Sequence, residues 1–331
     1  MPLQLPTTLK LPVMPNALWH LSSQHSTIRP ARLTEEGLHV RSLYSLVSTG
    51  TERLVARGEV PASLHELMAV PGMEGQFSFP VKYGYSLVGR VEAPGHPMDG
   101  RLVHCLHPHQ EACRLQEEAL YPLPETVPPL RATLASNLET AVNAVWDSKV
   151  SVGDRVLVLG FGMIGGLLSR VLSMMPAISL LIAEPSTARR SAALQMGFDA
   201  CRPEEVQGAF DHVFHTSGSG AGLQLAIEQA GMEGTITELS WYGTREATVR
   251  LGGHFHYRRQ QIISSQVSHL PAHRRPRWDY RRRKDAVFRL LETAAFDQHI
   301  QKVLPFADAP GFFDHLRAGA VDEIGTALQY T

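Results

Sequence analysis

Residues 156–172 read VLVLGFGMIGGLLSRVL and place Gly160, Gly162 and Gly165 between a β-branched and leucine-rich run and an apolar helix-forming segment. In such a strand–turn–helix unit the first glycine permits the tight turn, the second lets the backbone approach a pyrophosphate, and the third allows close helix–strand packing. The N-terminus of the helix then faces the negative charge. A second strand, SLLIAEP (179–185), ends in Glu184, where a carboxylate can bind a ribose diol. The stretch predicts a dinucleotide-binding βαβ unit; the alternative is a glycine turn that binds no nucleotide.

Strand-like and helix-like segments alternate after this unit, which is typical of a doubly wound, right-handed parallel sheet with helices on both faces. The segments are an expected helix over 163–175, a helix over 186–196, the strand FDHVFHTSG (210–218), the helix GLQLAIEQA (222–230), and the strands GTITELSWYG (234–243) and QQIISSQVS (260–268).

The residues before the glycine-rich unit have a different sequence pattern. Short β-rich runs such as LHVRSLYSLVST (38–49) alternate with proline and glycine, as in all-β domains with short loops. The tail after residue 267 is too small to fold alone. We therefore expect an α/β protein of two domains, with one domain built from residues 1–145 and 268–331 and a nucleotide-binding domain over 146–267.

Composition adds limits to this outline. The 331 residues carry a formal net charge of -1 with a pI near 7.0, so the overall charge does not suggest a nucleic-acid or membrane partner. Three scattered cysteines do not form a disulfide framework, which fits a cytoplasmic protein. The longest apolar stretch is interrupted by Arg170 and Pro176, so no transmembrane span is expected.

The segment VGDRVLVLGFGMIGG (152–166), placed after a β-rich domain, resembles the medium-chain dehydrogenase/reductase superfamily over almost the whole chain. The resemblance implies a GroES-like catalytic domain completed by the C-terminus, a Rossmann domain, an active site in the cleft between them, and a homodimer. Further motifs look like the subgroup that includes 2-desacetyl-2-hydroxyethyl bacteriochlorophyllide a dehydrogenase: STGTERL (48–54), the Pro-His pair in LHPHQ (106–110), SWYG (240–243), FHYRRQQIISSQV (255–267) and RPRWDYRRR (275–283).

Zinc-dependent members of this superfamily take their metal ligands from three motifs that are altered here. The first reads Thr49-Gly50-Thr51-Glu52, the second reads Gly84-Tyr85-Ser86, and the third falls at Ala135 or Ser136. Zinc prefers Cys, His and carboxylate ligands, so we expect no catalytic zinc. A second possible metal site is the cluster His104, Cys105, His107, His109 and Cys113, which would need ligands from elsewhere as well.

Without zinc, a side chain must exchange a proton with the substrate oxygen. By position, Thr51 corresponds to the superfamily's relay hydroxyl, and the Tyr85 phenol would point into the vacated metal space. His109 is the best acid–base candidate near neutral pH, and His107 falls where the superfamily lines its substrate pocket. Each has a structural alternative: Tyr85 fills a void, Thr51 holds its turn, and His109 is a hydrogen-bonded core histidine.

The cofactor is expected to be NAD, because Glu184 would repel a 2′-phosphate; NADP stays possible because Arg189 and Arg190 follow closely. The resemblance implies cofactor contacts at the glycine loop and at positions spread along the domain. These candidate cofactor-binding residues are Gly160, Gly162, Met163, Ile164, Gly165, Glu184, Arg189, Thr140, Ser217, Gly218, Ser265 and Gln266.

The basic segment between Arg274 and Lys284 is the strongest charge cluster of the chain. It is either a solvated loop and helix start or a lid that holds carboxylate or phosphate groups of a substrate; nucleic-acid binding is a weaker option because few aromatic residues accompany it. The substrate is expected to be a small molecule, with anionic or planar compounds among the options.

These features predict a zinc-independent NAD(P)-dependent oxidoreductase that acts on a secondary alcohol or ketone. Two alternatives remain at this point: a quinone or enone reductase that acts on a C=C bond, and a dinucleotide-binding or redox-sensing protein without catalysis.

Overall fold

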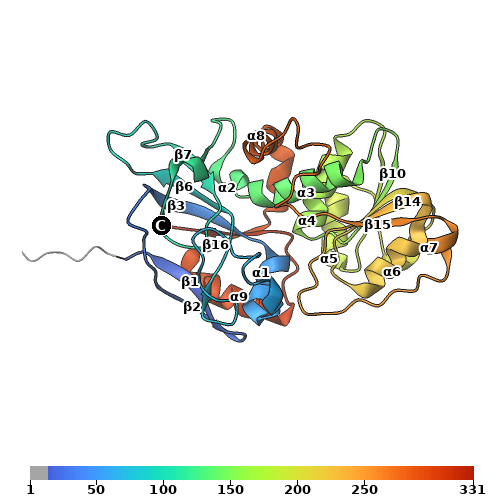
Figure 1. The fold of residues 1–331 in the computed structure, drawn as a ribbon, viewed down its shortest axis with the longest axis horizontal. Helices are drawn as coiled ribbons and strands as arrows, with labels where there is room; N and C mark the ends of the chain where they lie inside the picture. The colour runs from blue at the N-terminus through green and yellow to red at the C-terminus, as the bar shows by residue number, and fades with distance from the viewer. Residues whose placement is uncertain (1–13) are drawn as a thin grey trace, which may run out of the picture.

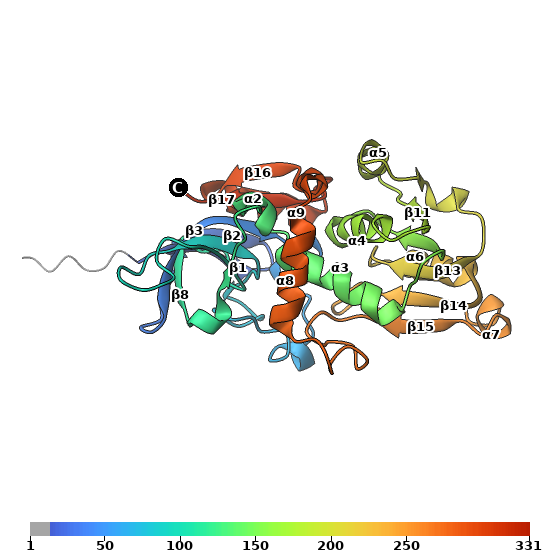
Figure 2. The same cartoon turned by 90° about the horizontal axis from the view of Figure 1, so that it is seen from above.

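The computed structural model describes residues 14–331, which form two lobes joined by two helices (Figures 1 and 2). The β-rich lobe holds two sheets. A four-stranded sheet has the order β2 (His25–Pro30), β1 (Asn16–Ser22), β5 (Val81–Lys82), β4 (Glu74–Gly75). A seven-stranded sheet runs along β16 (Lys302–Pro305), β17 (Thr326–Gln329), β3 (Leu38–Val47), β6 (Leu87–Val91), β7 (Leu102–Cys105) and β9 (Tyr121–Pro122), while β8 (Ala112–Leu115) pairs with β3.

The second lobe is the predicted doubly wound parallel sheet. Its six strands lie in the order β12 (Ala200–Cys201), β11 (Ser179–Ala183), β10 (Arg155–Leu159), β13 (Phe210–His215), β14 (Ala230–Glu238), β15 (Gln261–Ser264), and each pair is parallel. Helices α4 (Met163–Ser173), α5 (Thr187–Gln195), α6 (Gly220–Gln229) and α7 (His254–Tyr257) connect the strands. The sheet reverses its winding between β10 and β13, the place where doubly wound folds bind their ligands.

Two helices fill the region between the lobes. Helix α3 (Ala135–Ser148), which follows the short α2 (Pro129–Ala132), packs against α4 and α8 (Tyr280–Leu291), as Figure 2 shows. The apolar pattern AVFRLLETAAF (286–296) predicts a helix that begins at Ala286, whereas α8 begins six residues earlier at Tyr280. Asp279 accepts a hydrogen bond from the Arg282 amide and so caps the helix inside the basic segment.

The C-terminal tail returns to the first lobe. Strand β17 pairs antiparallel with β3, and Tyr330 shares a hydrogen bond with the Ser45 hydroxyl at 2.8 Å. Helix α9 (Ala309–Ala318) packs against α1 (Thr49–Arg57). The fold is therefore a GroES-like lobe completed by the tail plus a Rossmann lobe, as expected, while the domain boundaries at 145/146 and 267/268 stay a prediction.

Within residues 14–331, no helix is both long enough and apolar enough to cross a lipid bilayer.

Candidate active site

The three glycines of the loop between β10 and α4 differ in the space around them. A Cβ on Gly165 would lie 2.0 Å from the Gly160 carbonyl oxygen, so only glycine allows the helix this close to the strand. Gly160 has a φ of +101°, which the turn requires. A Cβ on Gly162, in contrast, would meet no protein atom nearer than Arg189 Nη1 at 3.8 Å. The protein therefore leaves room beside Gly162 for a group from outside the chain.

That space lies at the N-terminus of α4. Gly162 is the N-cap residue and no side chain caps the helix, so the first amides of α4 are free to bind an anion. Met163 is buried and Ile164 is half-buried in this first turn. The glycine loop and helix end fit the pyrophosphate of a dinucleotide, which is the role that the sequence predicted for them.

Glu184 lies at the end of β11 and holds the glycine loop in place. Its Oε2 accepts a hydrogen bond from the Phe161 amide at 2.6 Å and its Oε1 accepts one from the Ser186 amide at 2.8 Å, and the residue is only 4% exposed. Each carboxylate oxygen keeps a second lone pair. A ribose diol would have to share this carboxylate with the two amides.

Arginines from both lobes lie close to the glycine loop and the N-terminus of α4. Arg189 on α5 donates to the backbone oxygens of Val321 and Asp322 in the C-terminal segment, while its Nη1 faces Gly162. Arg245 comes within 3.7 Å of the Cβ position of Gly218. The pKa of Arg53 on α1 is lowered by burial and by the nearby positive charges of Arg245, Arg57 and Arg189. This gathering of positive charge suits a polyphosphate, and sequence analysis did not identify Arg53 or Arg245.

At the carboxyl ends of β13 and β14, a hydrogen-bonded chain surrounds the predicted ribose contact Ser217. His215 Nε2 lies 2.6 Å from Ser217 Oγ, and His215 Nδ1 lies 2.7 Å from Glu238 Oε2. The Tyr242 hydroxyl donates to the same carboxylate oxygen at 3.1 Å. Ser217 is exposed and His215 is fully buried, so the chain links a surface hydroxyl to a partly buried carboxylate. Val213, Phe214 and His215 are all buried, so the sequence pattern of this strand gave no signal for the pairing of His215 with Glu238.

The remaining predicted cofactor contacts lie on neighbouring elements. Ser265, directly after β15, donates from its hydroxyl to Asp147 on α3 at 2.7 Å. Burial raises the pKa of Asp147, and the hydrogen bond from Ser265 opposes this increase. Gln266 is exposed and Thr140 on α3 is half-buried. Their contacts with a nicotinamide ring stay a prediction.

The two hydroxyl residues expected in the vacated metal space lie together. The Tyr85 phenol lies beside the hydroxyls of Ser48 and Thr51, near the Glu52 carboxylate. Burial raises the pKa of Tyr85 to about 12; Glu52 adds to the increase and the two hydroxyls oppose it. At neutral pH the phenol is therefore protonated and can donate a hydrogen bond. A cationic nicotinamide beside the phenol would act in the opposite direction and lower the pKa of Tyr85.

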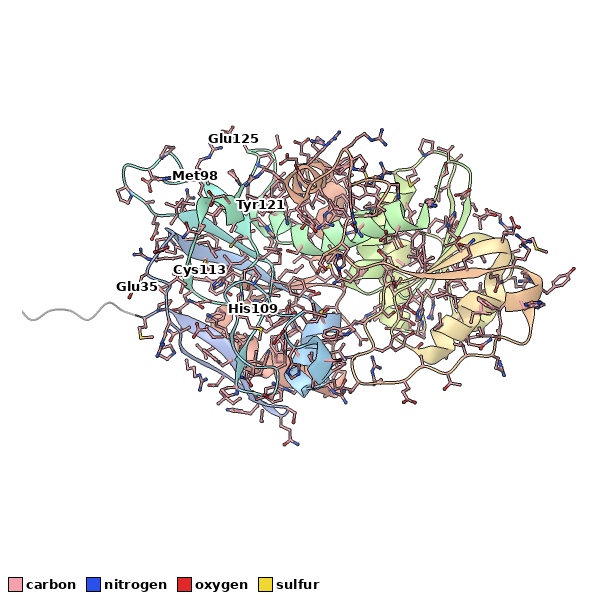
Figure 3. The ribbon with its side chains drawn as sticks, in the orientation of Figure 1. Glu35, Met98, His109, Cys113, Tyr121 and Glu125 are labelled. Atoms are coloured by element: carbon pink, nitrogen blue, oxygen red, sulfur yellow. The ribbon has the colours of Figure 1, made fainter. Side chains whose placement is uncertain are left out.

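His109 lies in the interior of the β-rich lobe (Figure 3) and has no exposed surface. Its Nε2 lies 2.8 Å from Glu52 Oε2 and its Nδ1 lies 2.7 Å from Ser45 Oγ, so both ring nitrogens are used. Glu52 also accepts the Ser48 amide at 2.7 Å through Oε1. This geometry fits the alternative of a hydrogen-bonded core histidine, because both ring nitrogens already have partners within the lobe.

His107 is also buried, and its Nδ1 lies 3.0 Å from the Pro108 carbonyl oxygen. Burial lowers the pKa of His107 to about 3, with a smaller contribution from Lys82, so the ring is neutral at physiological pH. Strand β7 ends at Cys105, so His107 and His109 do not continue its alternation. Their assignment as catalytic residues stays a prediction.

The donor set at the superfamily's zinc positions does not fit zinc. Thr49, Tyr85 and Ala135 or Ser136 supply neither thiolate nor imidazole nor carboxylate. Ser136 instead donates to the Tyr85 carbonyl oxygen at 2.8 Å. Between residues 14 and 331, no three His, Cys, Asp or Glu side chains group closely enough to form a metal site. We therefore derive no chemical step through a metal.

The Rossmann lobe supplies one wall of the region around Tyr85. Trp241, three residues beyond β14, packs against the same cluster of apolar residues as Tyr85. Thr244 donates its amide to the Glu59 carbonyl oxygen at 3.1 Å, which fixes this segment against α1 of the other lobe. Tyr85 thus lies where the two lobes meet, and Trp241 is a candidate substrate contact.

Solved structures of a dehydrogenase and a reductase share the fold of this chain. The chain resembles the 2R,3R-butanediol dehydrogenase of Bacillus subtilis with a TM-score of 0.73, 18% identity and coverage of 96% of this chain and 99% of the other. It also resembles the acetophenone reductase of Geotrichum candidum NBRC 4597 in complex with NAD, with a TM-score of 0.75, 16% identity and coverage of 97% and 98%.

Among curated proteins, the chain is similar to the D-guloside 3-dehydrogenase of Escherichia coli (strain K12). The two are 28% identical over 185 residues, which cover 51% of this chain and 53% of the relative. The match therefore spans about half the length of the curated relative. No family model matches the chain.

Proposed function

We propose that this protein is an NAD(P)-dependent oxidoreductase that interconverts a secondary alcohol and a ketone. The observation that carries the proposal is the open space at Gly162 beside the uncapped N-terminus of α4. Protein atoms fill the corresponding space beside Gly160 and Gly165. The fold shared with an alcohol dehydrogenase and a ketone reductase supports it. When bound, a nicotinamide cofactor supplies the hydride chemistry that side chains cannot.

The cofactor contacts that we propose are the three glycines of the loop, the first turn of α4, Glu184, Arg189 and Ser217. We propose NAD as the preferred form, because a 2′-phosphate near Glu184 would meet a second negative charge. Arg189 Nη1 faces the pyrophosphate position at Gly162 rather than the end of β11. Arg190 Nη1 does lie at the end of β11, where it donates to the Glu184 and Pro185 carbonyl oxygens, so NADP stays the alternative.

We propose Tyr85 as the residue that donates a proton to the substrate oxygen. Its raised pKa keeps the phenol protonated at neutral pH, as ketone reduction requires. The Ser48 and Thr51 hydroxyls lie near the phenol and are proposed to exchange its proton. In the oxidation direction the same group must first lose its proton, so oxidation requires alkaline conditions.

Zinc independence is part of this proposal and rests on the donor set, in which hydroxyl groups stand at the metal positions. Glu52 and His109 are proposed as positioning residues. They fix the first turn of α1 through the Ser48 amide, and so place Ser48 and Thr51 beside Tyr85.

The substrate class that we propose is a sugar derivative or polyol, because the curated relative that the chain matches is named a D-guloside 3-dehydrogenase. We further propose a cytoplasmic homodimer, based on the superfamily resemblance and on cysteines that are all free in the described part of the chain.

One experiment separates the candidate functions. The purified protein is titrated with NADH and NADPH by fluorescence, analysed for zinc, and then assayed with ketoses, simple ketones, enones and quinones. Ketone turnover with tighter NADH binding and no stoichiometric zinc supports the proposal. Turnover of enones alone favours a C=C reductase, cofactor binding without turnover favours a non-catalytic protein, and stoichiometric zinc refutes the metal-free mechanism.

A further inference from the structure

The start of the basic segment lies at the C-terminal end of α3, away from Tyr85. Trp278, within this segment, packs on Trp146 of α3 with ring centroids 4.7 Å apart. Trp146 lies eleven residues after Ala135 along α3, which is about 16 Å of helix at 1.5 Å per residue. The end of the segment returns along α3, where Arg283 and Lys284 pair with Glu139, whereas the arginines around Trp278 point to a second role at a distance from Tyr85.

A cavity of about 340 Å³ opens beside the two tryptophans. Helices α3, α4 and α8 line it with Val142, Val145, Trp146, Val171, Trp278, Ala286 and Leu290, and Arg289 completes the wall. Its walls are almost entirely apolar. The volume exceeds the roughly 150 Å³ of an engineered cavity that binds benzene, so a larger apolar group can enter.

Positive charge surrounds this cavity. The Arg274 guanidinium lies over the Trp146 ring at 5.1 Å, and the Arg282 guanidinium lies over the Trp278 ring at 4.3 Å. In the described part of the chain, Arg274 Nε is buried without a hydrogen-bond partner. Between residues 271 and 292 the chain has eight Lys or Arg residues against three Asp or Glu residues. Arg283 and Lys284 are paired with Glu139, whereas Arg274, Arg282 and Arg289 make no ion pair with the described residues.

We propose that this cavity binds a small anionic amphiphile, a molecule with an apolar body of about ten carbons and one carboxylate, sulfonate or phosphate group. The apolar body lies against Trp146 and Trp278 and the anionic group meets the guanidinium of Arg289, which lines the cavity. Burial of the apolar body supplies most of the affinity and the guanidinium group selects the charge. The site is separate from the proposed active site and does not depend on the proposed function.

Tryptophan fluorescence gives a direct readout, because two of the four tryptophans line the cavity. The protein is titrated with decanoate below its micelle concentration, with 1-decanol as the uncharged match, and with acetate as the charge without the chain. We expect saturable binding of decanoate at least about tenfold tighter than decanol and no saturation with acetate. Equal binding of decanoate and decanol, or no saturation with decanoate, overturns the proposal.

Variants locate the site. Ala286→Phe fills the cavity and leaves the charges, and Arg289→Gln removes a charge and leaves the cavity; each should weaken decanoate binding at least about tenfold. Arg250→Gln, at an exposed arginine on the Rossmann lobe, is the matched control and should change nothing. NADH affinity and the melting temperature are measured for each variant to show that it is folded. Undiminished decanoate binding in both cavity variants overturns the assignment. Binding of polyglutamate without binding of decanoate overturns it in favour of a surface for acidic polymers.

Discussion

A single methyl group added to the glycine loop should have opposite effects at two positions that are three residues apart. In Gly162→Ala the new Cβ meets no protein atom within 3.5 Å, and the native φ of -83° is acceptable for alanine. The variant should fold with wild-type or slightly higher stability, within about 1 kcal/mol. The methyl group projects into the space proposed for the pyrophosphate. NADH should therefore bind about 10- to 100-fold more weakly, a loss of about 1.4–2.8 kcal/mol.

In Gly165→Ala the Cβ would lie 2.0 Å from the Gly160 carbonyl oxygen and 2.7 Å from Thr216 Oγ1. Relief of this overlap requires movement of α4, so the free energy of unfolding should fall by about 1–3 kcal/mol or more. Urea denaturation and NADH fluorescence titration measure both effects, with Gly311→Ala, an open position on α9, as the control. A folded Gly162→Ala variant that binds NADH as tightly as wild type would refute the proposed pyrophosphate site at Gly162.

Four further outcomes test other parts of the molecule. Tyr85→Phe should lower kcat for ketone reduction by about 10²- to 10⁴-fold without changing the Kd for NADH; a wild-type kcat would remove Tyr85 from the mechanism. Because the pKa of Tyr85 is raised to about 12, the rate of alcohol oxidation should rise about tenfold per pH unit between pH 7 and 10 while reduction stays level; parallel profiles would contradict this assignment. His109→Ala should lower the free energy of unfolding by about 3–5 kcal/mol, because it leaves the buried carboxylate of Glu52 unpaired; a stable but inactive variant would instead indicate a direct catalytic role. Burial lowers the pKa of His20 and His107 to about 3 and that of His299 to about 4, so below pH 6.5 the unfolded chain binds more protons. Stability should therefore fall on acidification by up to about 1.4 kcal/mol per pH unit for each histidine, as measured by urea denaturation at pH 7, 6 and 5; a flat profile would show that these rings are not buried in the neutral form.

The Rossmann lobe was predictable from sequence because its signals are local. The glycine spacing and the apolar run before it identify β10 and α4, and the observed helix differs from the expected 163–175 by two residues at its C-terminal end. The start of α8 was misplaced because the residues that extend it are arginines, which carry no apolar period. Its first turn is instead stabilised by the Asp279 cap and by the buried pairs of Arg283 and Lys284 with Glu139.

The candidate site was predictable only in part, because its partners come from distant segments. Sequence position correctly grouped Thr51 with Tyr85, since both are read from aligned motifs. The same reading proposed His109 as an acid–base residue and did not foresee that Glu52 and Ser45 bind its two ring nitrogens. Pairs of this kind depend on how a loop side chain such as His109 is oriented toward a helix distant in the sequence, and residue type and spacing do not determine that orientation.

The parallel sheet of six strands is complete once the chain reaches residue 264, whereas β3 lacks its neighbour β17 until residue 329 has been made. During synthesis the nucleotide-binding lobe can fold while the edge of β3 is still open to solvent. The first lobe to appear in the sequence is thus the last to close, and until then its exposed strand edge is a place where newly made chains can aggregate or recruit a chaperone.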